Sequence, residues 1–107
     1  MNFQIIQIAA GKFHSMCLST NNNIFSWGES SHGRLGHGKI DSDILSPKEI
    51  YMLSKQKPIM IAAGESHSAA INHRHTLFTW GSGSFGKLGH GDEVRKFIPQ
   101  AVQSLES

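Results

Sequence analysis

Short apolar stretches alternate with turns rich in glycine and asparagine along the whole chain. Ile5–Ala10 and Met60–Ala63 are brief apolar runs, the pattern of a strand buried on both of its faces. Polar and apolar residues, many of them β-branched or aromatic, predict further strands at His14–Thr20, Ile24–Trp27, His67–Asn72 and Leu77–Trp80. No run approaches the roughly 18 residues that a membrane-spanning helix requires. The pattern therefore predicts an all-β protein made of short strands.

Each group of three strands is followed by the same spacing of proline and aliphatic residues, at Pro47–Leu53 and again at Pro99–Leu105. Proline is confined to strand starts and sheet edges, so these segments predict a fourth, outer strand. Asn21–Asn23 predicts a hairpin turn between the second and third strands, because asparagine tolerates left-handed backbone. The recurring glycines before the proline segments favour a compact loop over a helix.

The chain is an internal duplication. Residues 8–38 align with residues 61–91 at a constant offset of 53, with 15 identities in 31 positions and no gap. Beyond that block the offset falls to 52, and the two proline segments then match each other. A period of about 50 residues with four strands is typical of a β-propeller blade.

The duplicated residues carry a resemblance to a known family. Ile-Ala-Ala-Gly-x-x-His-Ser, then Trp-Gly, then Gly-x-Leu-Gly-His-Gly is similar to the repeat of the regulator of chromosome condensation family, over nearly the whole chain from Phe3 to Leu105. The resemblance implies β-propeller blades of four antiparallel strands, here two blades (1–57 and 58–107) of an incomplete propeller, because the family's propellers have seven. The structural repeat positions are Gly11, His14, Trp27, Gly28, Gly36, His37, Gly64, His67, Trp80, Gly81, Gly89 and His90.

Two positions depart from the family pattern, which usually places glycine five residues before the tryptophan. Asn22 and His75 stand there instead. Asparagine fits a left-handed turn at little cost, whereas histidine does not, so we expect the second hairpin to adopt a different turn.

Four groups of residues have patterns that can indicate a binding or catalytic site, and for each of them the sequence favours a structural role instead. Gly81–Gly86 has the spacing of a dinucleotide-binding loop, but the glycines that follow oppose the helix that such a loop needs. The four repeated histidines are expected to bond to backbone groups, and no ligand set for a metal converges. Cys17 aligns with Ala70, as a buried, inert thiol would. The two tryptophans are expected to pack between blades. We therefore expect no catalytic residue, no metal and no cofactor.

Charge and cysteine content limit which partners and which cellular location we expect for this protein. The formal net charge is +2 and the basic residues are scattered, so direct nucleic-acid binding through a basic stripe is not expected. A single cysteine excludes an internal disulfide, and no signal peptide is evident at the N-terminus. We expect an intracellular location, cytoplasmic or nuclear, and no membrane association.

Loops vary more than the strands that they connect, and binding residues are often found in them. We therefore look for partner-contact residues at loop positions that differ between the two repeats. The candidate partner-contact residues are Lys12, Phe13, Glu29, His32, Arg34, Glu65, Ser66, Phe85 and Lys87. The resemblance then implies a non-catalytic module for protein–protein interaction. The alternative is guanine-nucleotide exchange on a Ran-like small GTPase by the complete propeller. Two blades expose apolar faces, so we also expect further blades from a parent chain or self-association.

Overall fold

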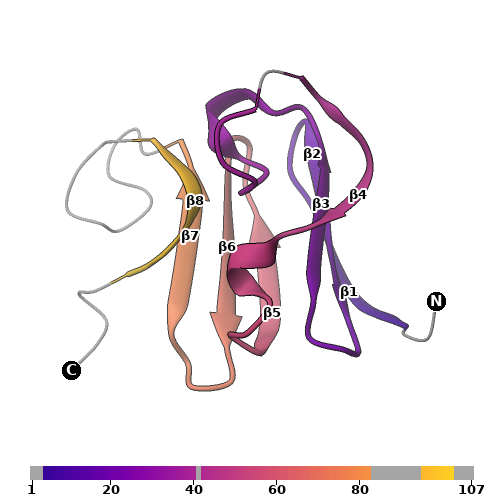
Figure 1. The fold of residues 1–107 in the computed structure, drawn as a ribbon, viewed down its shortest axis with the longest axis vertical. Helices are drawn as coiled ribbons and strands as arrows, with labels where there is room; N and C mark the ends of the chain where they lie inside the picture. The colour runs from indigo at the N-terminus through magenta and orange to yellow at the C-terminus, as the bar shows by residue number, and fades with distance from the viewer. Residues whose placement is uncertain (1–3, 41, 83–94, 103–107) are drawn as a thin grey trace.

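A computed structural model describes residues 4–40, 42–82 and 95–102 as two four-stranded antiparallel sheets standing side by side (Figure 1). The strands are ordered β1-β2-β3-β4 in the first sheet and β5-β6-β7-β8 in the second. The elements are β1 (Ile5–Ala10), β2 (His14–Ser19), β3 (Ile24–Gly28), η1 (Ser31–Gly33), β4 (Ile44–Glu49), η2 (Tyr51–Leu53), β5 (Pro58–Ala63), β6 (His67–Asn72), β7 (Leu77–Gly81) and β8 (Lys96–Ala101). The all-β fold of two blades is confirmed. The division at residues 57 and 58 stays a prediction.

Every neighbouring pair of strands runs antiparallel, so connections alternate between the two ends of the blades (Figure 1). We call the end formed by residues 11–13, 29–40, 42–43 and 64–66 the upper end. The lower end is formed by residues 20–23, 54–57 and 73–76. The upper end carries most of the candidate contact loops predicted from the sequence.

The two lower hairpins adopt the same turn, which corrects the expectation of a different turn at His75. Asn22 has φ 62° and His75 has φ 65°. The Asn22 amide donates to the Ser19 carbonyl at 3.0 Å, and the His75 amide donates to the Asn72 carbonyl at 2.9 Å. Strand pairing on either side fixes the turn geometry, and His75 accepts the left-handed strain that the turn imposes.

The fourth strand begins earlier than the proline spacing predicts. β4 runs along the outer edge of its sheet and contains Pro47, while Leu53 lies in the short 3-10 helix η2. An irregularity in the pairing of β3 with β4 accommodates the proline, which has no amide to donate. The segment after the strand nevertheless serves the core, because Ile50 and Leu53 are both buried.

The main hydrophobic core lies between the two blades. It joins Met16, Leu18, Ile24, Ile50 and Leu53 of the first blade to Ile61, Ala70 and Trp80 of the second. β5 packs against both β1 and β2, so the second blade rests on the inner strands of the first.

β1 corrects the prediction of a strand buried on both faces. Ile5, Ile6 and Ile8 are 47%, 58% and 73% exposed. β1 is the inner edge of its sheet and pairs with β2 alone. Only those of its residues that face β5 are therefore shielded from solvent by the second blade. On β5, Ile61 is buried while Ile59 and Met60 are exposed. Among the described residues, no helix has the length and apolar character needed to span a membrane.

Candidate interaction site

Loops from both blades meet at the upper end. The Lys12 ammonium lies 3.9 Å from the Glu65 carboxylate, and these two residues occupy the same position in the two repeats. Their side chains are largely exposed, so the pair adds little stability. The pair instead shows that the two predicted contact loops are adjacent in space.

Phe13 is an exposed aromatic ring with two cations close to it. It is 50% exposed, with the Lys12 ammonium 5.3 Å and the Arg34 guanidinium carbon 5.8 Å from the centre of its ring. Cations over an aromatic face are attracted by its quadrupole, which restricts the ring without burying it. We call Lys12, Phe13, Glu29, Arg34 and Glu65 the upper cluster.

Arg34 supports this cluster from below. It is only 2% exposed, so its guanidinium is not itself available at the surface. Its Nε donates to the Ser31 carbonyl at 2.8 Å, and its Nη2 lies 3.6 Å from Glu29. Its buried Nη1 has no hydrogen-bond partner among the described residues. The guanidinium is therefore fixed by its own loop and lies beneath Phe13.

The backbone carbonyl of Arg34 ties this loop of the first blade to the second blade. It accepts hydrogen bonds from the Ser68 hydroxyl at 2.8 Å and from the Trp80 indole Nε1 at 3.1 Å. Both donors are buried, and Trp80 is 0% exposed. The expected packing of tryptophan between blades is thus observed for Trp80, whereas Trp27 is half-buried in the described structure.

His14 completes this inter-blade network. Its Nε2 lies 2.8 Å from the Ser68 hydroxyl, which already donates to the Arg34 carbonyl. The network therefore assigns the proton to Nε2, which donates to the serine oxygen. Burial, aided by the positive charge of Arg34 and by His67, lowers the pKa of His14 to about 4. The imidazole is consequently neutral at physiological pH.

His37 repeats the arrangement within one blade. Its Nε2 lies 2.9 Å from the Ser26 hydroxyl, which donates to the Leu35 carbonyl at 2.6 Å. Burial lowers the pKa of His37. The sequence predicted that the repeated histidines bond directly to backbone groups. Instead, the short contacts of His14 and His37 are to serine hydroxyls that in turn donate to backbone carbonyls, while His37 also lies 3.4 Å from the Ser26 carbonyl. Sequence reasoning missed the serines, although His-Ser recurs in both repeats.

Among the described residues, no group of three His, Cys, Asp or Glu side chains is placed to hold a metal ion. Cys17 is buried, and that burial raises the pKa of its thiol, so the reactive thiolate is disfavoured. The glycine motif at 81–86 lies mostly outside the described residues.

Comparison with known proteins identifies the repeat. The model of the Regulator of chromosome condensation (RCC1) repeat matches residues 21–71 and 74–107, and a second RCC1 repeat model matches residues 5–34. The chain belongs to the RCC1 repeat family. Residues 21–71 contain β3 and β4 of one blade with β5 and β6 of the next, so this match spans the inter-blade interface.

Relatives with RCC1 repeats are much longer proteins. The chain is 35% identical over 106 residues to the human probable E3 ubiquitin-protein ligase HERC4, covering 99% of this chain and 10% of that protein. It is 36% identical over 104 residues to the ultraviolet-B receptor UVR8 of Arabidopsis thaliana, covering 97% of this chain and 23% of the receptor.

Solved structures agree with the RCC1 fold. Prp20p from Saccharomyces cerevisiae, described with its binding to Gsp1p and histones, superposes with a TM-score of 0.83 at 25% identity, covering 94% of this chain and 26% of Prp20p. Human WBSCR16 gives a TM-score of 0.84 at 22% identity, covering 94% of this chain and 26% of that chain, which supports the fold alone.

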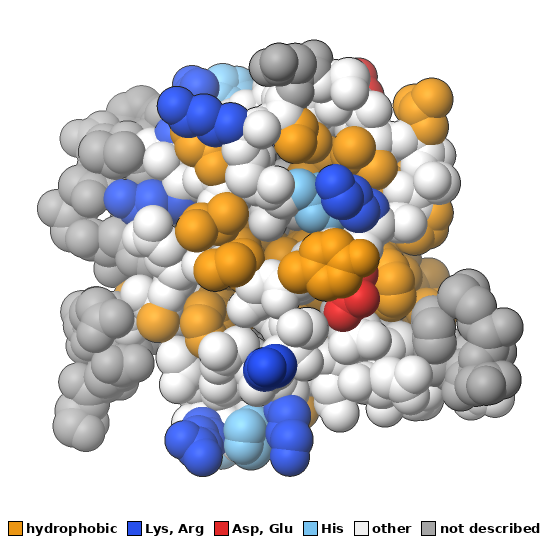
Figure 2. All heavy atoms as spheres, in the orientation of Figure 1, with side chains coloured by type: hydrophobic (Ala, Val, Ile, Leu, Met, Phe, Trp, Pro, Cys, Tyr) orange, Lys and Arg blue, Asp and Glu red, His pale blue; other side chains and the backbone are white. Residues whose placement is uncertain are grey.

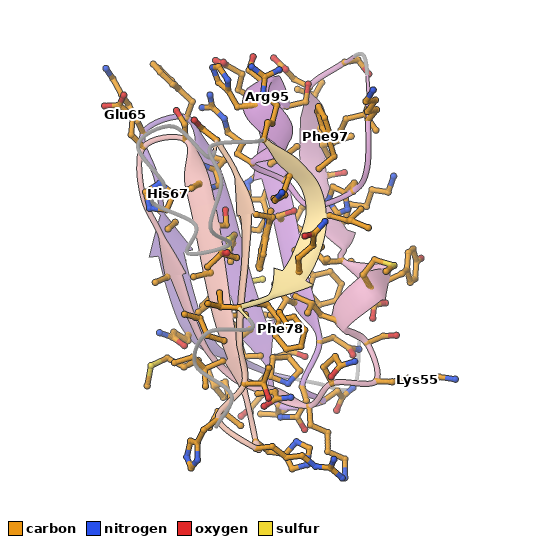
Figure 3. All side chains as sticks on the ribbon, turned by 90° about the vertical axis from the view of Figure 1, so that its left-hand side faces the viewer. Lys55, Glu65, His67, Phe78, Arg95 and Phe97 are labelled. Atoms are coloured by element: carbon orange, nitrogen blue, oxygen red, sulfur yellow. The ribbon has the colours of Figure 1, made fainter. Side chains whose placement is uncertain are left out.

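The structure places some of the predicted partner-contact residues of this RCC1 chain together and does not describe others. Lys12, Phe13, Glu29, Arg34 and Glu65 gather at the upper end, where Glu65 is labelled in Figure 3. His32 is exposed in η1, and Ser66 is partly buried beside Glu65. Phe85, Lys87, Gly89 and His90 lie outside the described residues. Partner contact by any of these residues stays a prediction.

Gln7 is an inter-blade residue that sequence reasoning passed over. Its side-chain amide forms two hydrogen bonds of 3.0 Å with the backbone of Ile61, one donated and one accepted. The sequence feature that could have indicated this role is that Gln7 is a polar residue within an otherwise apolar strand. The second repeat has Met60 at the aligned position, so comparison of the two repeats did not single out Gln7.

Proposed function

We propose that this chain is a non-catalytic RCC1 module that binds a protein partner through the upper cluster. The observation that carries the proposal is Phe13, an exposed aromatic ring steadied by Lys12 and Arg34 above the inter-blade interface. Restrained aromatic residues beside arginine are characteristic of interaction hot spots, because little conformational entropy is lost on binding.

The relatives support binding more than chemistry. The HERC relatives are named as ligases, but this chain corresponds to 10% of HERC4 and 2% of HERC2. Ligase activity is therefore not proposed for it. The RCC1 structures with bound or tested proteins, Prp20p with Gsp1p and histones and yeast RCC1 with Kap60, favour protein partners.

Binding to purified Gsp1p and to core histones tests the proposal. The chain would be immobilised, and the affinity of each probe measured for the natural sequence and for Phe13→Ala. We expect at least one probe to bind and Phe13→Ala to weaken that binding about tenfold or more, the scale of a hot-spot truncation. Leu45→Ala is the matched control, because Leu45 is an exposed apolar residue on β4 outside the cluster.

Two results would contradict the proposal: neither probe binds the natural chain, or both variants weaken binding equally. Circular dichroism of each variant would establish that the fold is retained.

Guanine-nucleotide exchange on a Ran-like GTPase is the second candidate. It is favoured by the likeness to Prp20p, whose description includes binding to Gsp1p. The rate at which a Ran-like GTPase releases a fluorescent guanine nucleotide separates the two functions. A binding module leaves that rate unchanged, whereas an exchange factor accelerates it.

A further inference from the structure

The β6–β7 hairpin and the turn before β5 carry a group of basic side chains at the lower end. Figure 2 shows blue and pale-blue side chains gathered at the bottom of the molecule. The residues of this group, here called the basic tip, are Lys57, His73, Arg74 and His75, and all four are exposed. The basic tip lies at the opposite end of the blades from the upper cluster, whereas Lys55 points sideways in Figure 3 and is not part of it.

Hydrogen bonds hold the basic tip on a defined frame. The buried side chain of Asn72 accepts hydrogen bonds from the amides of Arg74 at 3.0 Å and Thr76 at 2.9 Å. The His73 amide donates to the Lys57 carbonyl at 3.0 Å. The turn before β5 is therefore fastened to the β6–β7 hairpin, and the charged side chains project from a preorganised surface.

Two residues of the basic tip occupy strained backbone. Lys57 has φ 50° and His75 has φ 65°, a region that suits glycine or asparagine. A residue with a Cβ there costs about 1 kcal/mol relative to glycine. Basic side chains thus stand at two adjoining turns where glycine or asparagine would stabilise the fold, which points to a role other than stability.

The first blade shows that the scaffold does not need these charges. Residues 73–75 align with the neutral Thr20, Asn21 and Asn22, and Asn22 adopts the same left-handed conformation as His75. Neither salt bridge found among the described residues involves the basic tip. The basic residues of the β6–β7 hairpin are therefore not shared by the equivalent hairpin of the first blade.

We propose that the basic tip is a docking surface for a carboxylate-rich segment of a partner protein. Ammonium and guanidinium groups form charge-assisted hydrogen bonds with carboxylates, and several donors together on a rigid frame bind an extended acidic segment. A nucleic acid is the less favoured occupant, because phosphate recognition uses an extended basic stripe and the neighbouring hairpin of the first blade is neutral.

The test uses the whole chain and a fluorescent peptide of alternating glutamate and glycine, read by fluorescence anisotropy at low salt. The patch variant is Lys57→Gln with Arg74→Asn. The control variant, Lys39→Gln with Lys48→Gln, removes the same charge from exposed lysines elsewhere. We expect the patch variant to lose about tenfold in affinity, with less than about twofold loss in the control, because only the former removes contacts to the peptide.

A second patch variant distinguishes a loss of peptide binding from a folding defect. His73→Thr, Arg74→Asn and His75→Asn give the second hairpin the sequence that the first already uses in the same turn. This variant should retain the natural circular dichroism spectrum and also lose affinity for the peptide.

Three results overturn the proposal: the peptide does not bind the natural chain, the patch and control variants lose affinity equally, or an oligothymidylate of equal charge or phosphatidylserine vesicles bind more tightly than the peptide. A matched glutamine–glycine peptide should not bind. Because the probe and residues differ from those of the upper cluster, either surface can fail its test without affecting the other.

Discussion

At the scale of single residues, the contact between the blades depends on a small polar network inside an apolar core. The Ser68 hydroxyl accepts a hydrogen bond from His14 Nε2 and donates one to the Arg34 carbonyl. That carbonyl also accepts a hydrogen bond from the Trp80 indole. In a low-dielectric interior such bonds are strong, and losing one partner leaves another buried polar atom unsatisfied.

Ser68→Ala should therefore lower the free energy of unfolding by about 1–3 kcal/mol, because it removes the acceptor of the buried His14 Nε2–H and one of the two donors to the Arg34 carbonyl. Ser15→Ala is the matched control, because Ser15 has the same repeat position but makes no side-chain hydrogen bond with the described residues. Urea denaturation followed by circular dichroism measures both. Equal losses in the two variants would contradict the inter-blade network.

The buried, neutral His14 should make stability depend on pH. Its pKa is about 4 in the folded chain and about 6.5 when unfolded, so the unfolded chain binds the proton first. The stability contributed by neutral His14 is complete above pH 6.5 and is lost as the pH falls toward 4. The loss is on the order of 3 kcal/mol.

Urea denaturation at several pH values between 6.5 and 4 would measure that dependence. His14→Gln should reduce the slope of unfolding free energy against pH, because the titrating group is removed. An unchanged slope in that variant would show that His14 does not titrate differently in the folded and unfolded chains.

At the scale of elements, local sequence predicted the strands well and the connections less well. The first three strands of each blade lie within one or two residues of the predicted ranges, because apolar patterning and glycine are local signals. The turn at His75 was misjudged because the pairing of β6 with β7 outweighs the backbone preference of one residue. The fourth strand was displaced because Pro47 lies inside β4 rather than at its start.

Gly36 and Gly38 in the connection after β3 provide a matched test of inter-blade packing. Both have positive φ, but a Cβ on Gly36 would lie 2.8 Å from the indole nitrogen of Trp80, whereas a Cβ on Gly38 would meet nothing within 4 Å. Gly38→Ala should cost about 1 kcal/mol from backbone strain. Gly36→Ala should cost about 1–3 kcal/mol more, because it also displaces the indole.

Thermal unfolding of both variants measures that difference. Similar losses would mean that the loop at Gly36 does not pack tightly against Trp80.

At the scale of the whole molecule, neither blade has a complete core of its own. The buried cluster takes residues from both sheets, and Gln7, Ser68 and Trp80 form hydrogen bonds across the interface. Each sheet alone would expose much of this apolar surface, and isolated small sheets are marginally stable.

We therefore expect the two blades to unfold together in a single transition. Trp27→Phe leaves Trp80 as the fluorescent reporter of the second blade, while circular dichroism follows both sheets. The two signals should give the same urea midpoint, as in a two-state transition. Separate midpoints would show that the blades are independent units and that the interface does not couple them.

The sequence by itself determined the repeat and the four-strand blade, and it predicted structural roles for the repeated glycines and histidines. These depend on local patterning and on comparison of one repeat with the other. It also brought together the candidate loop residues, since both loops recur at one position of the blade. Only the tertiary structure decided that His14 bonds to Ser68 rather than to its neighbour Ser15, that Arg34 is buried beneath Phe13, and that β1 is exposed. The physical reason is distance along the chain: His14 and Ser68 are 54 residues apart, and their contact exists only because one sheet packs against the other.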